Sequence, residues 1–199
     1  MPFDLKQNPG YGLTVLTGPG IPVLDDEDLK LRCHCDVPAL LPLLVSHEKA
    51  AVATLQNQLG RQFIECEWYQ VWDGWPAEMA LWRNPVLGAS HLYYRHTDGT
   101  LIEASSEDYE CINSLEPAVI VPIGSPTWPS APRAVIATFL AGYGPDASYV
   151  PDDLKQAIAM LVVHYLQNPS AVVTGTIAAE LPQGVQALIE TFRYVPGVT

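Results

Sequence analysis

The sequence predicts an α+β protein in which helical segments at both ends of the chain flank a central, antiparallel β-rich segment. Apolar residues recur with the helical period over 41–59 and again over 154–166, which indicates two amphipathic helices. Between Phe63 and Gly144 the pattern changes to short runs rich in β-branched and aromatic residues. Eighteen prolines and fourteen glycines supply the many turns that such a β-rich segment requires.

Two helices are expected before the β-rich segment. Asp25 is the expected N-cap of a short first helix, because a side-chain acceptor and the acids that follow suit the positive end of the helix dipole. Asp36 is the expected N-cap of the second helix, with Pro38 in its first turn and Gly60 as its C-terminal cap. Pro42 either lies in that first turn or moves the start later. The apolar stripe of this helix comprises Leu41, Val45, Val52, Leu55 and Leu59, widened by Leu40, Leu44 and Ala51.

Seven short strands are expected in the middle of the chain. Asp98 and Gly99 predict a type I′ hairpin turn, in which both central residues need a positive φ. Closely spaced antiparallel strands favour a compact sheet or a small sandwich. The expected strands cover residues 64–72, 79–82, 89–94, 101–104, 109–112, 118–122 and 134–141.

Two further helices are expected near the C-terminus. The first carries Asp152 and Asp153 in its first turn and ends at Pro169. The second opens at Pro182 after a loop of small residues. Its expected buried stripe comprises Val185, Leu188, Ile189 and Phe192.

The elements divide the chain into four parts. Residues 1–23, rich in Pro and Gly, are expected to form an extended arm rather than a folded element, and residues 24–60 an N-terminal helical part. Residues 61–145 form the β-rich part, and residues 146–199 the C-terminal helices and tail. Because 48% of the residues are hydrophobic, we expect 24–199 to fold as one compact domain.

The formal net charge of −12 argues against a protein that coats DNA, because duplex binding depends on Lys and Arg displacing counterions from phosphates. An acidic body suits a channel through which DNA passes without adsorbing, and it equally suits any acidic protein in solution. The chain has no run of about 18 apolar residues and no basic N-terminal region followed by an apolar core. We therefore expect no membrane association and no secretory signal, and a protein assembled in the cytoplasm.

The motif Cys33-His34-Cys35 is the one pattern that suggests a metal. Zinc sites pair cysteines two to four residues apart and use a second pair elsewhere, whereas here the spacing is one and Cys66 and Cys111 stand alone. Free buried thiols are the favoured interpretation over a metal site or a disulfide. We expect no metal and no cofactor.

No pattern of a known catalytic site is present in the sequence. The acids at 25–28 and 152–153 are explained as helix caps, and those at 107–110 as a solvated loop. Four tryptophans gather near the first strands, which is typical either of core and subunit packing or of a face that stacks on sugars. They are Trp68, Trp72, Trp75 and Trp82. A carbohydrate- or peptide-binding β-module and an enzyme are thus the alternatives to an assembly protein.

The order of the elements and of several short motifs resembles the head–tail connector (adaptor) proteins of tailed bacteriophages and gene-transfer agents. The resemblance spans about residues 22 to 195 and departs from the family pattern at two points. Leu59 stands where a Thr usually precedes the Gly, and Asn168 is followed by Pro-Ser instead of Arg-Glu. The motifs are Gly60-Arg61, Trp72-Asp-Gly-Trp-Pro76, Asn84-Pro85-Val86, Trp128-Pro129 and Gly142-Tyr-Gly144.

The resemblance implies a structural protein without catalytic activity. Such connectors form a ring, most often of twelve copies, beneath the portal protein at the head–tail joint of the virion. The ring prolongs the channel through which DNA passes without specific binding, and it docks a stopper or tail-completion protein. A stopper or tail-completion role for this chain itself is a further alternative.

Two segments are the expected contacts with partners. The family's C-terminal end reaches the portal, which makes Phe192, Arg193, Tyr194 and Val195 candidate interface residues. Aromatic residues and Arg are typical of binding hot spots, although the helical stripe also explains Phe192 as a core residue. The second candidate is the N-terminal arm together with the loop at 170–180, which would become ordered against neighbours.

Overall fold

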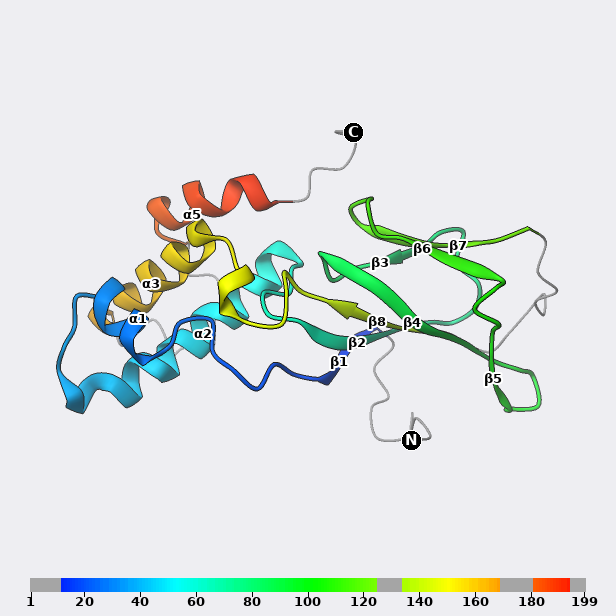
Figure 1. Cartoon of the computed structure of the whole chain (residues 1–199), viewed down its shortest axis with the longest axis horizontal. Coiled ribbons are helices and arrows are strands. Elements are labelled where there is room, and N and C mark those ends of the chain that lie inside the picture. The colour runs from blue at the N-terminus through cyan, green and yellow to red at the C-terminus, as the bar shows by residue number, and fades with distance from the viewer. Residues whose placement is uncertain (1–11, 125–133, 169–180, 194–199) are drawn as a thin grey trace. The chain divides into compact units, whose positions relative to one another are not determined.

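The computed structural model describes residues 12–124, 134–168 and 181–193 of the chain (Figure 1). The chain divides into two compact units. The β unit comprises the described residues of 1–18 and 65–142, and the helical unit those of 19–64 and 143–199. The predicted α+β class, with a central β segment between helices, is confirmed. The fourfold division proposed from the sequence stays a prediction.

All described strand pairs of the β unit are antiparallel, and the strands form two sheets. The order is β1-β2-β8-β4-β5 in the five-stranded sheet and β3-β7-β6 in the three-stranded sheet. The expected strands are confirmed, three of them with the predicted bounds and β4 with a longer span. The bounds are β1 Leu13–Thr17, β2 Cys66–Trp72, β3 Met79–Leu81, β4 Val86–Arg95, β5 Leu101–Glu103, β6 Tyr109–Ile112, β7 Ala118–Pro122 and β8 Ala134–Ala141.

One apolar core joins the two sheets of the β unit. Leu81 and Ile120 of the smaller sheet belong to the same buried cluster as Leu92 and Phe139 of the larger sheet. The Gln70 side chain also links the two sheets by hydrogen bonds. Its amide donates to the Ala80 carbonyl at 2.8 Å, and its oxygen accepts from the Trp82 N–H at 3.0 Å. Of the two predicted arrangements, the unit is therefore the small sandwich.

Two local predictions for the β unit were wrong. Part of the expected arm is strand β1, which pairs with β2 from Leu13 opposite Gln70 onward, because its alternating Leu, Thr and Val residues favour a pleated edge. The turn at Asp98 is not type I′, since only Gly99 in this loop has a positive φ. The Gly99 N–H donates to the His96 carbonyl, which places the glycine at the end of the turn, as in a longer hairpin loop.

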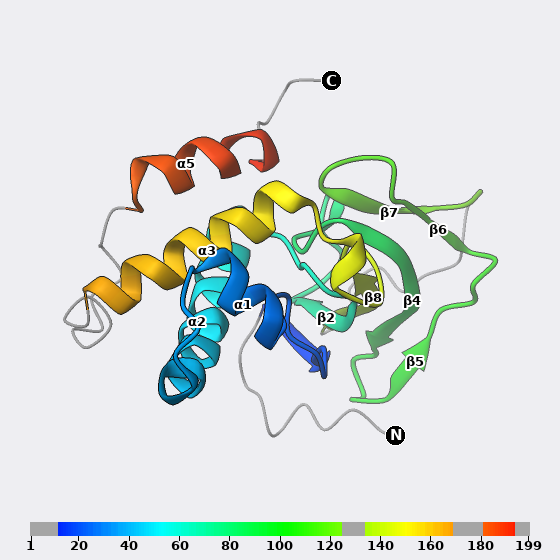
Figure 2. The ribbon, with the colours of Figure 1, turned by 60° about the vertical axis from the view of Figure 1, so that its left-hand side comes forward.

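The helical unit contains four described α-helices and three short 3-10 helices. Figures 1 and 2 show α3 between α2 and α5. No described helix is long and apolar enough to cross a membrane. The bounds are α1 Asp26–Arg32, η1 Pro38–Leu40, α2 Leu41–Leu59, η2 Ala147–Tyr149, α3 Asp152–Gln167, α5 Gln183–Ile189 and η3 Glu190–Phe192.

Local sequence explains where these helices begin and end. The predicted cap of α1 is confirmed, because the Asp25 carboxylate accepts from the Asp28 N–H at 2.8 Å. The cap predicted at Asp36 was wrong: a 3-10 turn precedes α2, and Pro42 sits in the first turn of a helix that starts later. Gly60 ends α2 with a φ of 65°, as predicted.

One apolar core fills the helical unit, and a hydrogen bond joins the two segments that connect this unit to the β unit. Leu55 of α2, Ile158 of α3 and Val185 of α5 are fully buried in it. The Tyr143 N–H donates to the Phe63 carbonyl at 3.0 Å, so the two segments that connect to the β unit run side by side here. This contact is followed by an isolated parallel bridge between residues 64 and 144.

Candidate interaction surfaces

The Cys33-His34-Cys35 motif ends helix α1. His34 has a φ of 51°, in the left-handed region, and its N–H donates to the Leu31 carbonyl at 3.3 Å. The Cys35 N–H reaches back to the Lys30 carbonyl at 3.0 Å. These two bonds are the Schellman arrangement, which normally uses glycine at the left-handed position. The motif therefore has a structural role that its composition did not reveal.

The thiols of this motif are free, and Cys33 is buried. The Cys33 Sγ donates to the Ala159 carbonyl at 3.8 Å, and burial raises the pKa of this thiol. Among the residues that the structure describes, no three His, Cys, Asp or Glu side chains are grouped so that they could hold a metal ion.

The acidic clusters serve local structure. Asp25 is the N-cap of α1, and Asp152 and Asp153 lie in the first turn of α3, although the cap residue there is Pro151. Glu107 is exposed in the loop between β5 and β6, as predicted, whereas Glu110 of the same cluster lies in β6.

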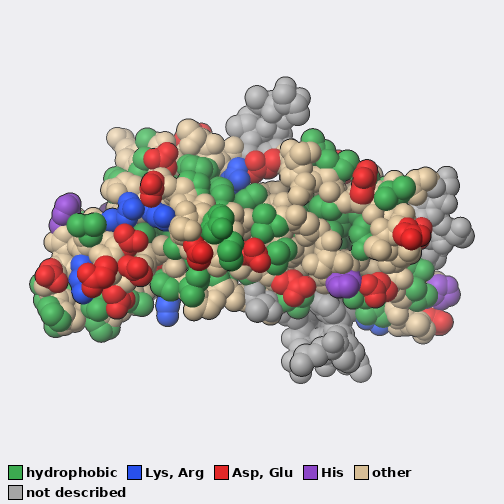
Figure 3. Space-filling model, in the orientation of Figure 1, with side chains coloured by type: hydrophobic (Ala, Val, Ile, Leu, Met, Phe, Trp, Pro, Cys, Tyr) green, Lys and Arg blue, Asp and Glu red, His purple; other side chains and the backbone are tan. Residues whose placement is uncertain are grey.

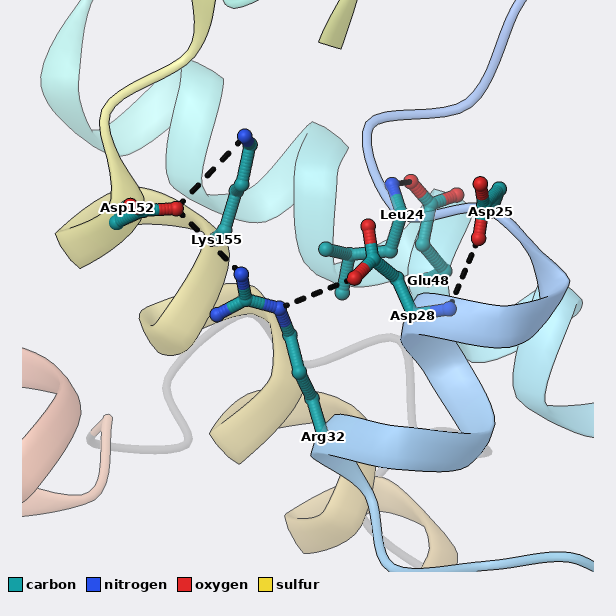
Figure 4. A network of polar contacts seen from close by, with 7 residues as sticks. All are labelled: Leu24, Asp25, Asp28, Arg32, Glu48, Asp152 and Lys155. Carbon is teal, nitrogen blue, oxygen red and sulfur yellow. Dashed lines mark hydrogen bonds and ion pairs between the residues drawn. The ribbon is translucent and has the colours of Figure 1, made fainter. Parts of the chain in front are cut away.

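A network of charged side chains joins the C-terminal end of α1 to the N-terminal end of α3 (Figure 4). Arg32 at the end of α1 lies 3.6 Å from the Asp28 carboxylate and 3.4 Å from that of Asp152 on α3. Lys155 approaches the same Asp152 carboxylate at 3.8 Å. Because Asp152 is highly exposed, solvent screens these pairs and each contributes little to stability.

Glu48 is the one acidic residue among the buried residues of the described chain, and 2% of its surface is exposed. Its Oε1 accepts from the N–H groups of Val23 and Leu24 at 3.0 and 3.3 Å, which ties the segment before α1 to the middle of α2. Figure 4 shows the Leu24 contact. Burial raises the pKa of Glu48, and the two backbone hydrogen bonds oppose that rise. Sequence periodicity gave no sign of this contact, because its partners are 25 and 24 residues away.

An apolar groove lies beside this contact. The segment 19–23 and one face of α2 line a hollow of about 500 Å³. This volume falls within the range of small ligand pockets, about 300–1,000 Å³. We call it the helical groove; its lining includes Ile21, Pro22, Val45, Lys49, Val52 and Ala53.

Lys49 lies on the lining of the helical groove and differs from four of the other described cations. The side chains of Lys30, Arg32, Lys155 and Arg193 all lie in ion pairs with acids. Lys49 is exposed and has no ion pair or hydrogen bond within the described residues. Its charge lies near the buried Glu48 carboxyl and opposes the rise that burial causes in the pKa of that group.

A second exposed apolar surface lies on the β unit. Trp82 is 57% exposed after β3, Leu87 is exposed at the start of β4, and Leu115 is 45% exposed in the turn between β6 and β7. We call these residues together with Glu116 the sandwich tip. Its two segments lie side by side, as the next bonds show.

Hydrogen bonds through two asparagines hold the sandwich tip together. The Asn84 oxygen accepts from the Ala118 N–H at 3.3 Å, and its amide donates to the Leu81 carbonyl at 3.3 Å. The Asn113 amide donates to the Leu87 carbonyl at 3.1 Å. The exposed apolar side chains of the tip therefore project from a fixed backbone.

The predicted C-terminal interface is only partly within the described residues. Phe192 is half-buried against the core of the helical unit, and its carbonyl accepts from the Arg61 Nε at 2.7 Å. Arg193 is exposed and pairs with Glu190 at 3.2 Å. Tyr194 and Val195 lie outside the described residues, as does the predicted loop at 170–180. The interface assignment stays a prediction.

Three of the four clustered tryptophans pack inward rather than forming a common outer face. Trp68 is buried, with the Arg83 guanidinium 4.7 Å from its ring centre. Trp72 and Trp75 pack against the core of the β unit, and Trp75 leans on Tyr94 with ring centres 5.9 Å apart. This arrangement accounts for these three tryptophans by packing.

Acidic side chains are scattered over the face of the molecule drawn in Figure 3, and they do not form one continuous patch there.

Comparison with known proteins gives a likeness of fold. The sequence matches no protein-family model and no curated protein. Among solved structures, the chain matches one in the neck of an empty gene transfer agent (GTA) particle computed with C6 symmetry, with a TM-score of 0.74 and 23% identity. The alignment covers 94% of this chain and 97% of that one. This chain therefore shares the fold of that neck chain.

Two more matches have the same coverage. One is a chain in the virion of a native gene transfer agent particle, at a TM-score of 0.74 and 23% identity. The other is a chain in the neck of a native GTA particle computed with C12 symmetry, at a TM-score of 0.68 and 24% identity. The resemblance drawn from sequence motifs is thus matched at the level of the fold.

Proposed function

We propose that this protein is a structural subunit of a particle neck, a head–tail connector of a tailed phage or gene-transfer particle. The observation that carries the proposal is the two-way coverage of the fold match: 94% of this chain aligns with 97% of a neck chain. The match thus covers the whole fold rather than one shared part of it. The motif order found in the sequence, from Gly60 to Gly144, supports the same assignment independently.

The proposed assembly is a ring of twelve copies beneath the portal protein, and the ring docks a stopper or tail-completion protein on its other side. The neck structures with this fold were computed with C6 and C12 symmetry, and a twelve-membered ring has both. The net charge of −12 suits a channel wall, because like charges disfavour adsorption of the passing DNA. The work of such a protein is specific association, and no chemical step is proposed.

The C-terminal end is the proposed contact with the portal. Phe192 is anchored to the helical unit through its carbonyl and Arg61, so the residues after it leave from a fixed point. The exposed Arg193 offers a cation near that point, and Tyr194 and Val195 follow in the sequence. An Arg beside aromatic residues is a common hot-spot composition.

Electron microscopy of particles made without this gene tests the proposal. Filled or leaking heads without tails, alongside free finished tails, are the expected result. Intact, tailed and infectious particles would refute a role at the head–tail joint. A direct binding assay between the purified protein and portal separates a connector from a stopper, because a stopper does not need to bind portal itself.

Deleting residues 193–199 tests the proposed portal contact. We expect a folded protein that no longer binds portal, because the deletion removes the candidate interface and only one described residue, which is exposed. Glu107→Ala, in an exposed loop of the β unit, is the matched control and should bind normally. Unchanged portal binding by the truncated protein would contradict the assignment.

A further inference from the structure

A hollow lies in the β unit, at the turn that joins β2 to β3. Its volume of about 380 Å³ is near the lower end of the range for ligand pockets. All of its lining belongs to one compact unit, so a single chain builds the whole site. We call it the tryptophan pocket; its lining comprises Val71, Trp72, Asp73, Gly74, Trp75 and Pro76.

Two indoles and one carboxylate give the tryptophan pocket its chemistry. Trp72 and Trp75 pack against the core of the β unit, yet both stay partly exposed. Asp73 is exposed, and its carboxylate takes part in no ion pair or hydrogen bond among the residues that the structure describes. The faces of aromatic rings carry partial negative charge, so the indoles and the carboxylate all attract a cation.

We propose that the tryptophan pocket receives an arginine side chain of a partner protein. The planar guanidinium stacks on aromatic rings and offers paired N–H donors to a carboxylate, whereas the Lys ammonium is a strongly hydrated point charge. The β unit already contains one contact of this kind, because the Arg83 guanidinium lies 4.7 Å from the ring centre of Trp68. The net charge of −12 also attracts a basic surface on a partner.

Other ligands that bind tryptophans fit this lining less well. A sugar ring carries hydroxyl groups along its edge, and apart from the indole N–H groups only the Asp73 side chain of the lining can form hydrogen bonds to them. A proline-rich peptide would occupy the indoles but leave the carboxylate without a partner. A guanidinium uses both the aromatic rings and the acid.

The fold holds the two indoles in place. Trp72 ends β2, where it lies opposite Val135 of β8. The ring centre of Trp75 is 5.9 Å from that of Tyr94. Side chains that are already packed lose little conformational freedom on binding, which favours even a small ligand group.

The chain's own arginines indicate that a different protein supplies the ligand. Apart from Arg133, which lies outside the described residues, each arginine already contacts a group of its own chain. The contacts join Arg32 to Asp152, Arg61 to the Phe192 carbonyl, Arg83 to Trp68, Arg95 to the Gly99 carbonyl and Arg193 to Glu190.

NMR titration of the purified full-length protein tests the pocket and does not depend on the neck role. The probe is Nα-acetyl-arginine amide, and the readout is the indole N–H signals of the five tryptophans. We expect millimolar binding that moves the signals of Trp72 and Trp75. Asp73→Asn should weaken binding about three- to fivefold, because it removes an exposed ion pair. Glu107→Gln, which removes an exposed acid elsewhere on the β unit, is the matched control and should bind as the wild type does.

Three comparison ligands decide the chemical class. Nα-acetyl-citrulline amide has the same shape without the charge, and equal binding by it would overturn the cation site. Equal binding by Nα-acetyl-lysine amide would overturn the choice of arginine. Shifts of these two signals with glucose but not with the arginine probe would make the pocket a sugar site instead.

Photo-cross-linking in particle-producing cells tests the source of the arginine. The photoreactive residue p-benzoylphenylalanine replaces Ala77, which is exposed and follows the lining residue Pro76. We expect a cross-linked peptide of a different protein with an arginine close to the linked position, and Asp73→Asn should reduce its yield. A cross-link to a second copy of this chain, or a yield unchanged by Asp73→Asn, would overturn the proposed partner.

Discussion

Replacing Glu48 tests the buried carboxylate that fixes the start of the helical unit. In Glu48→Ala the N–H groups of Val23 and Leu24 lose their shared acceptor, and both residues are buried. Each unpaired buried donor costs about 1–3 kcal/mol. Because the groove borders Val23, water can reach these amides, so we expect about 2 kcal/mol, the lower end of that sum. For a chain of this length that loss lowers Tm by about 4–8 °C.

Glu48→Gln keeps an acceptor oxygen and removes the charge, which separates the two effects. Burial raises the pKa of Glu48 above its ordinary value near 4.5. The folded state therefore holds this proton to a higher pH than the unfolded chain does. The resulting stability is complete below the unfolded pKa and is lost as pH rises through the folded pKa. Between the unfolded and the folded pKa of Glu48, the free energy of unfolding of the Gln variant should therefore rise relative to that of the wild type. The rise is at most about 1.4 kcal/mol per pH unit.

Urea unfolding followed by circular dichroism between pH 4 and 8 measures both effects. Glu107→Gln, which removes an exposed acid, is the matched control and should follow the wild type. An Ala variant within about 0.5 kcal/mol of the wild type would refute the role of the two hydrogen bonds. A Gln variant that loses stability relative to the wild type as pH rises would refute the reasoning from burial.

Three further predictions concern packing, surface charge and thiol reactivity. Gly144→Ala should cost about 1–3 kcal/mol, because a Cβ there would clash with Cγ and Cβ of Tyr149, and thermal unfolding should show most of that loss relieved in a background of Tyr149→Gly, which removes both atoms. Arg32→Ala should change the free energy of unfolding by less than about 1 kcal/mol, and high salt should abolish the difference, because its partner Asp152 is highly exposed. Burial raises the pKa of Cys66 to about 11, so iodoacetamide at pH 8 should alkylate it only after unfolding, and mass spectrometry showing rapid labelling in the native protein would contradict this.

Sequence patterns predicted most elements because the forces that select them are local. β6, β7 and β8 follow from short runs bounded by turn residues, and the end of α2 follows from Gly60. The errors are also local in origin. Asp36 is a good cap residue, yet Pro38 and Pro42 divide the segment so that a 3-10 turn forms first and α2 starts after it.

The surfaces escaped prediction because contacts between distant residues build them. The groove depends on Glu48 binding the amides of residues 23 and 24, and the sandwich tip depends on Asn84 reaching residue 118 across 34 positions. Neither pairing has a periodicity that a sequence can display. The exposure of Trp82 is likewise invisible in a sequence, because three similar tryptophans nearby pack inward.

The residues that suggested chemistry in the sequence are occupied by structural tasks wherever the structure describes them. Cys33, His34 and Cys35 end a helix, and Asp25 begins one. The described surface also presents apolar area and exposed charged side chains. Those are the means by which proteins recognise one another. The described chain thus uses several of its polar residues to stabilise its own fold, and it exposes apolar side chains at the helical groove and at the sandwich tip.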